Sequence, residues 1–381
     1  MPGDAPIAIR AVVVMPLAFL RGGAELALRN LVCFGNGHGI SWLVVFLEHG
    51  PMVDDLASQG VATVVVPAGR FRQLARTAAT VLGITRLIRR HRADVVVSWM
   101  SKGQVYGGPA AALARVPATW YQVGTPSPGS RLERLATLLP ARTILTCSGS
   151  GAVAQDGLVP RRPVRVVYPG IALDRFDPHS LPPPQEARRL LGMPQDGPMI
   201  GTVGRLQRWK GMHLLIEAMP TILQAHPRTH CVVVGERHDL EPDYLRHLED
   251  LVEALGLQEH VQLLVQRSSP MWVQAMDVAV HVSENEPFGI VVVEAMALAK
   301  PVVAGNTGGP TELITDGENG VLVPFGDSAA VARAVSRFLS DPDLAAQTGA
   351  AAHLRAQEFS VKSFVSSFSS AVEQIVRPVH G

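Results

Sequence analysis

The segment at residues 283–294 holds the residues with the clearest capacity for chemistry, Ser-Glu-Asn-Glu-Pro-Phe-Gly-Ile-Val-Val-Val-Glu. It follows an apolar run, Val278–Val282, that is typical of a buried strand. Glu286 would therefore emerge near the carboxyl end of a strand, where parallel α/β sheets bind ligands. A helix is expected around Ile290–Leu298, Pro287 suits the first turn of a helix, and the free N–H groups around Phe288–Ile290 would then attract a phosphate.

The spacing between Glu286 and Glu294 bears on the kind of reaction. Eight residues of a helix rise about 12 Å and turn about 80° beyond whole turns. That separation is wide for the carboxylate pair of a glycosidase, which lies roughly 5–9.5 Å apart. It favours a site in which the two carboxylates bind the two sugars on either side of a diphosphate. The alternative is that Glu286 caps the helix and Glu294 is an ordinary helical residue.

A second candidate segment, residues 201–211, reads Gly-Thr-Val-Gly-Arg-Leu-Gln-Arg-Trp-Lys-Gly. A strand is expected to end at Gly204, which places Arg205 and Lys210 on the loop before the next helix. Two cations there would neutralise a diphosphate and stabilise it as a leaving group, as a metal ion would. The alternative is a pair of solvated basic residues.

Glycine pairs follow two other expected strands. Gly22 and Gly23 lie in the run Arg-Gly-Gly-Ala-Glu after the first strand, where backbone N–H groups would reach a phosphate. A plain tight turn is the alternative for this pair. The run Asn-Thr-Gly-Gly-Pro-Thr-Glu at 306–312 repeats the same strand-to-glycine arrangement.

These loops need two parallel sheets to position them. Short β-branched runs alternate with helical periodicity along the whole chain, which predicts parallel sheets with helices on both faces. The expected strands are Ile7–Met15, Ser41–Phe46, Ala62–Val66, Asp94–Ser98, Ala118–Val123, Thr143–Cys147, Met199–Val203, His230–Val234, Val261–Val265, Val278–Val282, Pro301–Ala304 and Val321–Val323. Loops are expected at Ser98–Tyr106 and Gly124–Ser130, in the N-terminal half of the chain.

The 381 residues are too many for one ordinary core and predict two domains. We expect an N-terminal Rossmann-like domain at 1–170, a Pro-rich linker at 171–198, a C-terminal Rossmann-like domain at 199–360 and a terminal helix at 361–381. The linker is marked by prolines at 178, 182–184, 194 and 198. Two such domains make the cleft between them the expected ligand site.

Composition restricts the class of protein. The chain is 47% hydrophobic and 18% charged with a net charge of +1, which gives no reason to expect nucleic acid as a partner. The apolar run Ala11–Leu20 is interrupted by Pro16 and is far shorter than the ~20 residues of a spanning helix. Three isolated cysteines suit a reducing compartment, so a cytoplasmic location is expected.

A basic run at 86–92, Arg-Leu-Ile-Arg-Arg-His-Arg, leaves membrane contact open. Basic amphipathic helices bind anionic lipid, and weak peripheral contact with the inner membrane face is one interpretation. The other is a solvated helix end, where basic residues are favourable in any case.

Taken in order along the chain, these segments resemble the large retaining glycosyltransferase family 4, which has the GT-B fold. The matching parts are the early Gly-Gly loop, Gly-Arg at 204–205 with Lys-Gly at 210–211, the E-x7-E element ending at Glu294, Gly-Gly-Pro-Thr-Glu at 308–312, and Asp-Gly-Glu-Asn-Gly at 316–320. The resemblance covers nearly the whole chain. It implies two Rossmann-like domains that face each other across a cleft, with the C-terminal helix returning to the N-terminal domain.

The resemblance also implies roles for individual residues. Arg205, Lys210 and Glu286 would be the catalytic residues, with the two cations on the donor diphosphate and the carboxylate on hydroxyls of the transferred sugar. Glu294 would bind the ribose, and the base would lie near Val265–Arg267. The implied donor-binding set is Gly22, Gly23, Gln122, Gly204, Val265, Gln266, Phe288, Gly289, Ile290 and Glu294.

Two features bear on the site's chemistry. Gln122 stands where many family members carry a histidine near the donor sugar's C6; it can donate and accept hydrogen bonds but cannot titrate. No Asp-x-Asp motif or paired-histidine spacing marks a metal site, so no metal and no further cofactor is expected.

The expected function is transfer of a hexose-type sugar from a nucleoside-diphosphate sugar, UDP-linked by the family's majority, to a hydroxyl acceptor with retention. A sugar-nucleotide epimerase or hydrolase on the same fold is one alternative, and a non-catalytic sugar-nucleotide-binding subunit is another. The acceptor stays open among a glycan, a lipid-linked sugar and a small molecule.

Overall fold

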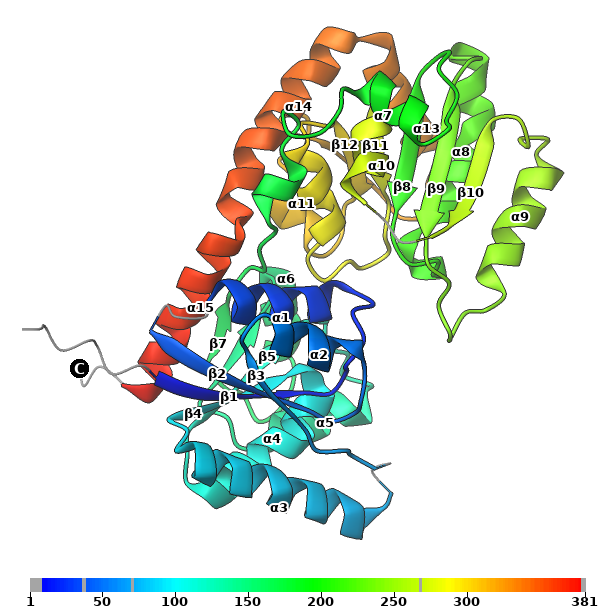
Figure 1. Cartoon of the computed structure of the whole chain (residues 1–381). Helices are drawn as coiled ribbons and strands as arrows, with labels where there is room; N and C mark the ends of the chain where they lie inside the picture. Colours follow the sequence, from blue (N-terminus) through cyan, green and yellow to red (C-terminus); the bar gives the residue numbers. More distant parts are fainter. Residues whose placement is uncertain (1–8, 36–38, 70–71, 267–268, 378–381) are drawn as a thin grey trace, which may run out of the picture. The chain divides into compact units, whose positions relative to one another are not determined.

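In a computed structural model the chain folds into two compact units, Met1–Gly170 with Val361–Gly381, and Ile171–Ser360 (Figure 1). The structure describes residues 9–35, 39–69, 72–266 and 269–377. Each unit contains one parallel sheet with helices against it, so the predicted pair of Rossmann-like domains is confirmed.

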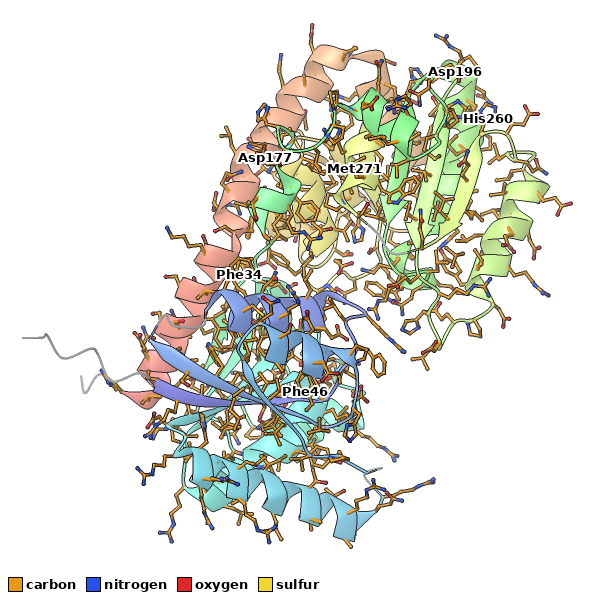
Figure 2. The ribbon with its side chains drawn as sticks, in the orientation of Figure 1. Phe34, Phe46, Asp177, Asp196, His260 and Met271 are labelled. Carbon is orange, nitrogen blue, oxygen red and sulfur yellow. The ribbon has the colours of Figure 1, made fainter. Side chains whose placement is uncertain are left out.

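The first unit contains a seven-stranded sheet in the order β3-β2-β1-β4-β5-β6-β7, with every recorded pairing parallel. Its strands are β1 Ile9–Met15, β2 Ile40–Phe46, β3 Ala62–Val65, β4 Val95–Trp99, β5 Ala118–Gln122, β6 Thr143–Thr146 and β7 Val164–Val166. Apolar runs suit strands buried on both faces, and Phe46, labelled in Figure 2, is fully buried at the end of β2. Sequence periodicity missed β7 because three residues are too few to show it.

Seven helices of this unit are described: α1 Gly23–Phe34, α2 Pro51–Ser58, α3 Leu74–His91, α4 Met100–Ala114, α5 Arg131–Leu138, α6 Gly149–Asp156 and α15 Val361–Val376. Figure 1 shows α1 and α2 on one side of the sheet and α3 and α4 on the other. The terminal helix α15 packs on α1, β4 and β5. Its Phe368 ring lies 5.9 Å from the Trp99 ring and 5.4 Å from the Tyr121 ring, measured between centroids.

The expected loop at Ser98–Tyr106 is wrong, because these residues end β4 and begin α4. Four residues of low helix propensity, at 103, 107, 108 and 109, concealed the helix. The glycines are there for contact: a Cβ added at Gly107 would lie 2.3 Å from the Ser98 hydroxyl oxygen. Close packing against the sheet thus overrides a poor local preference.

The second unit contains a six-stranded parallel sheet in the order β10-β9-β8-β11-β12-β13. Its strands are β8 Met199–Val203, β9 His230–Gly235, β10 Val261–Val265, β11 Val278–His281, β12 Val302–Gly305 and β13 Val321–Val323. Its helices are η1 Leu173–Phe176, α7 Pro184–Leu190, η2 Arg208–Lys210, α8 Met212–Ala225, α9 Tyr244–Ala254, α10 Pro270–Ala275, α11 Ile290–Ala297, α12 Pro310–Leu313, α13 Ser328–Ser340, α14 Pro342–Ala356 and η3 Gln357–Phe359. One apolar cluster joins the sheet to α8, α9 and α13.

The segment for which a linker is expected, 171–198, lies within the second unit. Helix α7 packs on α10, and its Arg188 is only 4% exposed. The Arg188 guanidinium donates to the carbonyl of Ala275 at 2.7 Å and to Asp277 Oδ2 at 2.6 Å. Asp277 Oδ2 also accepts the backbone N–H of Met199, the first residue of β8, at 2.7 Å. This ion pair therefore fastens the segment to the sheet.

Replacing Arg188 by Met should destabilise the protein by about 1–3 kcal/mol, because it leaves the carbonyl of buried Ala275 without this donor and removes the ion pair with Asp277. Arg189→Met is the matched control, since Arg189 is 64% exposed in its side chain and pairs with an exposed Glu186. Urea denaturation should show a lower free energy of unfolding for the first variant and no measurable change for the second. Equal losses in both variants would contradict this role for Arg188.

Candidate functional site

The two charged segments singled out in the sequence meet at one point of the second sheet. Strand order reverses between β8 and β11, and ligands of open α/β sheets bind at such a switch point. The loop that carries Arg205 and Lys210 leaves β8, and the loop that carries Glu286 leaves β11. The topology therefore brings the predicted cations and carboxylate to the same edge of one sheet.

Two glycines hold these loops against each other. Gly211 has a φ of 68°, and a Cβ added there would lie 1.8 Å from the carbonyl oxygen of Val282. Gly308, with a φ of 71°, approaches the Glu286 carbonyl so closely that an added Cβ would lie 2.2 Å away. Only glycine fits either position, because other residues lack both the space and the backbone conformation.

Backbone hydrogen bonds complete the same contacts. The N–H of Glu284 donates to the carbonyl of Trp209 at 2.8 Å, and the N–H of Gly309 donates to the carbonyl of Glu286 at 2.7 Å. The Thr307 hydroxyl donates to the carbonyl of Glu284. The loops after β8, β11 and β12 are thus tied together around residues 284–286.

A buried charge cluster forms where the loops meet. Lys210 Nζ makes an ion pair with Glu286 Oε2, and each side chain is only 11% exposed. His281 Nε2 lies 2.9 Å from the same carboxylate oxygen. Since a carboxylate accepts and does not donate, Nε2 of this histidine carries the proton. The Ser283 hydroxyl lies 3.0 Å from His281 Nε2.

The environment keeps the Glu286 carboxylate charged. Burial alone would raise its pKa, but the charge of Lys210 and the hydrogen bond from His281 hold that pKa well below its usual range. Glu286 is therefore ionised throughout the neutral pH range, as a hydroxyl-accepting group must be.

The two cations of the β8 loop differ in how they are engaged. Lys210 is bound to Glu286 and lies over the indole ring of Trp209, 4.1 Å from its centroid. Arg205 is half-buried, and within the described ranges its side chain has no recorded hydrogen bond or ion pair. An uncommitted guanidinium beside a paired ammonium can receive an anion.

The helix expected around Ile290–Leu298 is confirmed, but Pro287 does not lie in its first turn. Helix α11 begins at Ile290, after Gly289 at its N-cap with a φ of 104°, and Glu286 instead forms an isolated β-bridge with Gly308. The eight-residue helical spacing calculated from sequence therefore does not apply. No side chain caps the first turn of α11, and the Phe288 ring packs on Phe359 at 5.6 Å.

Glu294 occupies a different environment from Glu286. It lies on α11, partly buried, and burial raises its pKa to about 8, although Arg175 of η1 opposes the shift. No contact recorded among the described residues joins it to Lys210 or Glu286. Its expected binding of a ribose stays a prediction.

The other implied donor-binding residues take the following places. Gly204 directly follows β8 and has a φ of 157°, and Val265 and Gln266 are exposed at the end of β10. Arg267, expected beside the base, lies outside the described residues. Gly22 and Gly23 are the N-cap and first residue of α1, after β1 at the switch point of the first sheet. Their contacts with a donor stay predictions.

Gln122 is the last residue of β5 and is 3% exposed. Its amide Nε2 donates to Glu133 Oε2 at 2.9 Å, and Ser101 Oγ donates to the same oxygen at 2.7 Å. The residue expected to bind the donor sugar is therefore the buried member of a three-residue polar network.

Sequence reasoning missed His281, Ser283, Ser101 and Glu133. A signal existed for the first two. His281 and Ser283 stand two residues apart at a strand end, so their side chains point to the same side of the strand, just before Glu286. No local pattern links Ser101 with Glu133, which lie 32 positions apart.

One matched motif has a structural role. In the run at 316–320, Asn319 is 5% exposed, accepts the N–H of Thr315 at 2.7 Å and donates to the carbonyl of Leu313 at 3.1 Å. Asp316 accepts the N–H of Leu322 at 2.8 Å. These bonds shape the turn between α12 and β13.

No helix among the described residues is both long and apolar enough to cross a membrane. In the same part of the chain, no group of three His, Cys, Asp or Glu side chains is placed to hold a metal ion.

Known proteins match the chain over most of its length. The family model Glycosyltransferase Family 4 matches residues 21–175, and the model Glycosyl transferases group 1 matches residues 184–355. A relative named D-inositol 3-phosphate glycosyltransferase, from Geodermatophilus obscurus, is 33% identical over 84% of this chain and 77% of its own length. The protein of that name from Corynebacterium urealyticum is 37% identical over 47% of this chain; there the match spans 44% of the relative.

Solved structures agree with the fold. The crystal structure of Anabaena Alr3699/HepE in complex with UDP and glucose matches with a TM-score of 0.85 and 26% identity, over 96% of this chain and 99% of that one. The complex of the same protein with UDP-glucose also matches with a TM-score of 0.85.

The raised pKa of Glu294 predicts a pH dependence of stability. A carboxyl whose pKa is about 8 in the folded state, against 4.5 when unfolded, binds its proton more tightly in the folded protein. Stability should therefore fall as pH rises from about 5 to 9. Glu294→Gln should remove that part of the fall, on the order of 1–3 kcal/mol, since partial exposure and Arg175 reduce the full effect.

Chemical denaturation of both proteins at pH 5, 7 and 9 measures this difference. Glu249→Gln is the control, because Glu249 is exposed on α9 of the same unit. If the wild type and Glu294→Gln show parallel pH profiles, the burial of this carboxyl has no energetic consequence.

Proposed function

Because the chain belongs to glycosyltransferase family 4, with the GT-B fold, we propose that it transfers a hexose-type sugar from a UDP-sugar to a hydroxyl acceptor with retention and without a metal. One observation supports this more than any other. A buried, ionised Glu286 stands paired with Lys210 at the switch point of the second sheet, and Arg205, on the loop of Lys210, makes no side-chain hydrogen bond or ion pair with the residues that the structure describes.

The proposed mechanism assigns the cations to the leaving group. Arg205 and Lys210 bind the diphosphate, and the negative charge that develops as the sugar–phosphate bond breaks is stabilised by both. Lys210 then exchanges part of its contact with Glu286 for contact with phosphate oxygen. His281 keeps its hydrogen bond to Glu286 during that exchange, so the carboxylate stays placed for the sugar's hydroxyls.

The transfer step needs no protein nucleophile. The acceptor hydroxyl oxygen bonds to the anomeric carbon on the face from which the diphosphate departs, and its proton passes to the departing phosphate oxygen. The configuration at the anomeric carbon is therefore kept. The two cations bind most strongly once negative charge has developed on the departing diphosphate. They therefore stabilise the transition state more than the bound donor.

The similar proteins suggest which substrates to test first. UDP and UDP-glucose are bound in the Anabaena structures, which supports a uridine donor for this chain. Relatives that match over part or most of their length are named D-inositol 3-phosphate glycosyltransferase, which supports a phosphorylated cyclitol as the first small-molecule acceptor to test.

Lys210→Ala should weaken UDP binding at least tenfold, which corresponds to about 1.4 kcal/mol for a lost charge-assisted contact with phosphate. Lys362→Ala, at an exposed position of α15, is the matched control and should bind UDP as the wild type does. Titration calorimetry with UDP, GDP and ADP, each with and without EDTA, measures these affinities. Absence of binding of all three, or binding lost on adding EDTA, would overturn the donor assignment.

Turnover then separates the proposed transferase from a hydrolase or epimerase. With UDP-glucose as donor, UDP release should depend on an added acceptor such as 1D-myo-inositol 3-phosphate. Steady consumption of the donor at the same rate without any acceptor would favour the alternative enzymes.

His281→Leu should lower turnover about 10- to 100-fold, because it removes a hydrogen bond to the charged Glu286. His281→Gln should restore most of it, since a glutamine amide can donate from nearly the same place as Nε2. Measured kcat for both variants, with thermal unfolding to compare folding, tests this positioning role. Equal losses in the Leu and Gln variants at unchanged stability would refute it.

A further inference from the structure

A second polar cluster lies in the first unit, built from two consecutive strand–helix connections, β4–α4 and β5–α5. Ser101 is in the first turn of α4, Gln122 ends β5, and Glu133 is in the first turn of α5. Because β4 and β5 are parallel neighbours, all three lie at the carboxyl edge of the sheet. Ser101 and Gln122 are 5% and 3% exposed, whereas Glu133 is only partly buried.

The Glu133 carboxylate does not make the helix-capping hydrogen bond that its local sequence predicts. The run from Ser130 to Glu133, Ser-Arg-Leu-Glu, is a capping box, in which the glutamate would accept the backbone N–H of Ser130. Half of the box forms, since Ser130 Oγ accepts the N–H of Glu133 at 3.3 Å. The other half does not, because the N–H of Ser130 donates to the carbonyl of Ser127 at 2.9 Å.

The carboxylate instead meets two buried donors through a single oxygen. Ser101 Oγ and Gln122 Nε2 both donate to Glu133 Oε2, at 2.7 and 2.9 Å. Burial raises the pKa of this carboxyl, and the two hydrogen bonds oppose that rise without reversing it. The partial burial of a carboxyl that could stay solvated at the helix end opposes folding, a cost that a binding role would explain.

The other oxygen remains available. Within the described part of the chain, Glu133 Oε1 makes no hydrogen bond. It is also not one of the buried side-chain oxygen atoms that lack a partner, so it is accessible. One oxygen is therefore fixed by the protein while the other faces accessible space. That geometry presents a preoriented acceptor to a hydroxyl group, and its negative charge disfavours a phosphate at the same point.

Gln122 takes a different part in this cluster from the one expected of it. Its Nε2 is engaged by Glu133, and its Oε1 lies 3.3 Å from Ser101 Oγ. The buried amide therefore positions Glu133 and does not itself reach out of the cluster. Gln122 stands where the resemblance implies a sugar contact. Its amide instead holds the Glu133 carboxylate, which is the group left to make such a contact.

We propose that Glu133, held by Ser101 and Gln122, is a binding residue for a hydroxyl of a sugar or cyclitol. The hydroxyl belongs either to a hexose or to a cyclitol acceptor. Both assignments rest on the proposed function. Binding of the hydroxyl compound itself does not depend on that function, so it can be measured without nucleotide or turnover.

Saturation-transfer NMR with glucose and with myo-inositol as separate probes tests the proposal on the full chain, with and without UDP. Glu133→Gln is the central variant: its side-chain oxygen can still accept from Ser101 and Gln122, while an NH₂ group replaces the free oxygen. Glu373→Gln, exposed on α15 of the same unit, is the matched control. Thermal unfolding of each variant establishes that it is folded.

At least one of the two probes should bind the wild type and the Glu373 control equally, and Glu133→Gln about tenfold more weakly. Loss confined to glucose assigns the hydroxyl to the hexose, and loss confined to myo-inositol assigns it to the acceptor. Equal binding of both probes by wild type and Glu133→Gln, or no binding of either probe by wild type, overturns the proposal.

A calorimetric titration of Glu133→Gln with UDP separates the two hypotheses. UDP affinity equal to that of wild type is expected, since the cations proposed to bind UDP belong to the second unit. If UDP does not bind the wild type at all, the proposed function fails while the result with the two probes still decides on Glu133.

Discussion

The chemistry of the second unit depends on how closely its backbone segments approach one another. Where the loop after β8 meets the end of β11, and where the loop after β12 meets Glu286, carbonyl oxygens lie inside the space that a side chain would need. Glycines 211 and 308 are therefore requirements of the contact rather than flexible joints. Without this approach, Lys210 and Glu286, 76 positions apart, would belong to separate loops in water.

Two glutamates eight positions apart show how strongly the surroundings decide a carboxyl's state. Glu286 is surrounded by an ammonium, an imidazole N–H and a hydroxyl, and its pKa falls. Glu294 meets mostly apolar neighbours on α11, and its pKa rises to about 8. Glu286 accepts hydrogen bonds as an ionised carboxylate throughout the neutral pH range. Glu294 can donate a proton until a ligand or base changes its environment.

Sequence alone predicts the sheets well because parallel strands buried on both faces are continuous apolar runs. It also places Lys210 and Glu286 on loops that leave two neighbouring strands, where the structure pairs them, while the roles expected of them stay predictions. It fails where distant contacts decide. Pro287 lies outside the first turn of α11, and α4 forms despite Gly103 and Gly107, which approach β1 and β4 too closely for a side chain. The partners of Glu133 are set by topology, which no local pattern encodes.

The first unit is discontinuous in the chain, and this has a consequence for biosynthesis. Phe364 and Phe368, which pack on Trp99 and Tyr121, belong to α15 and follow the whole of the second unit in sequence. A ribosome therefore exposes the strands of the first sheet long before it supplies the helix that covers their aromatic residues. The second unit is contiguous and can finish folding while the first still has an uncovered apolar face. Residues made after the second unit thus complete the core of the first unit.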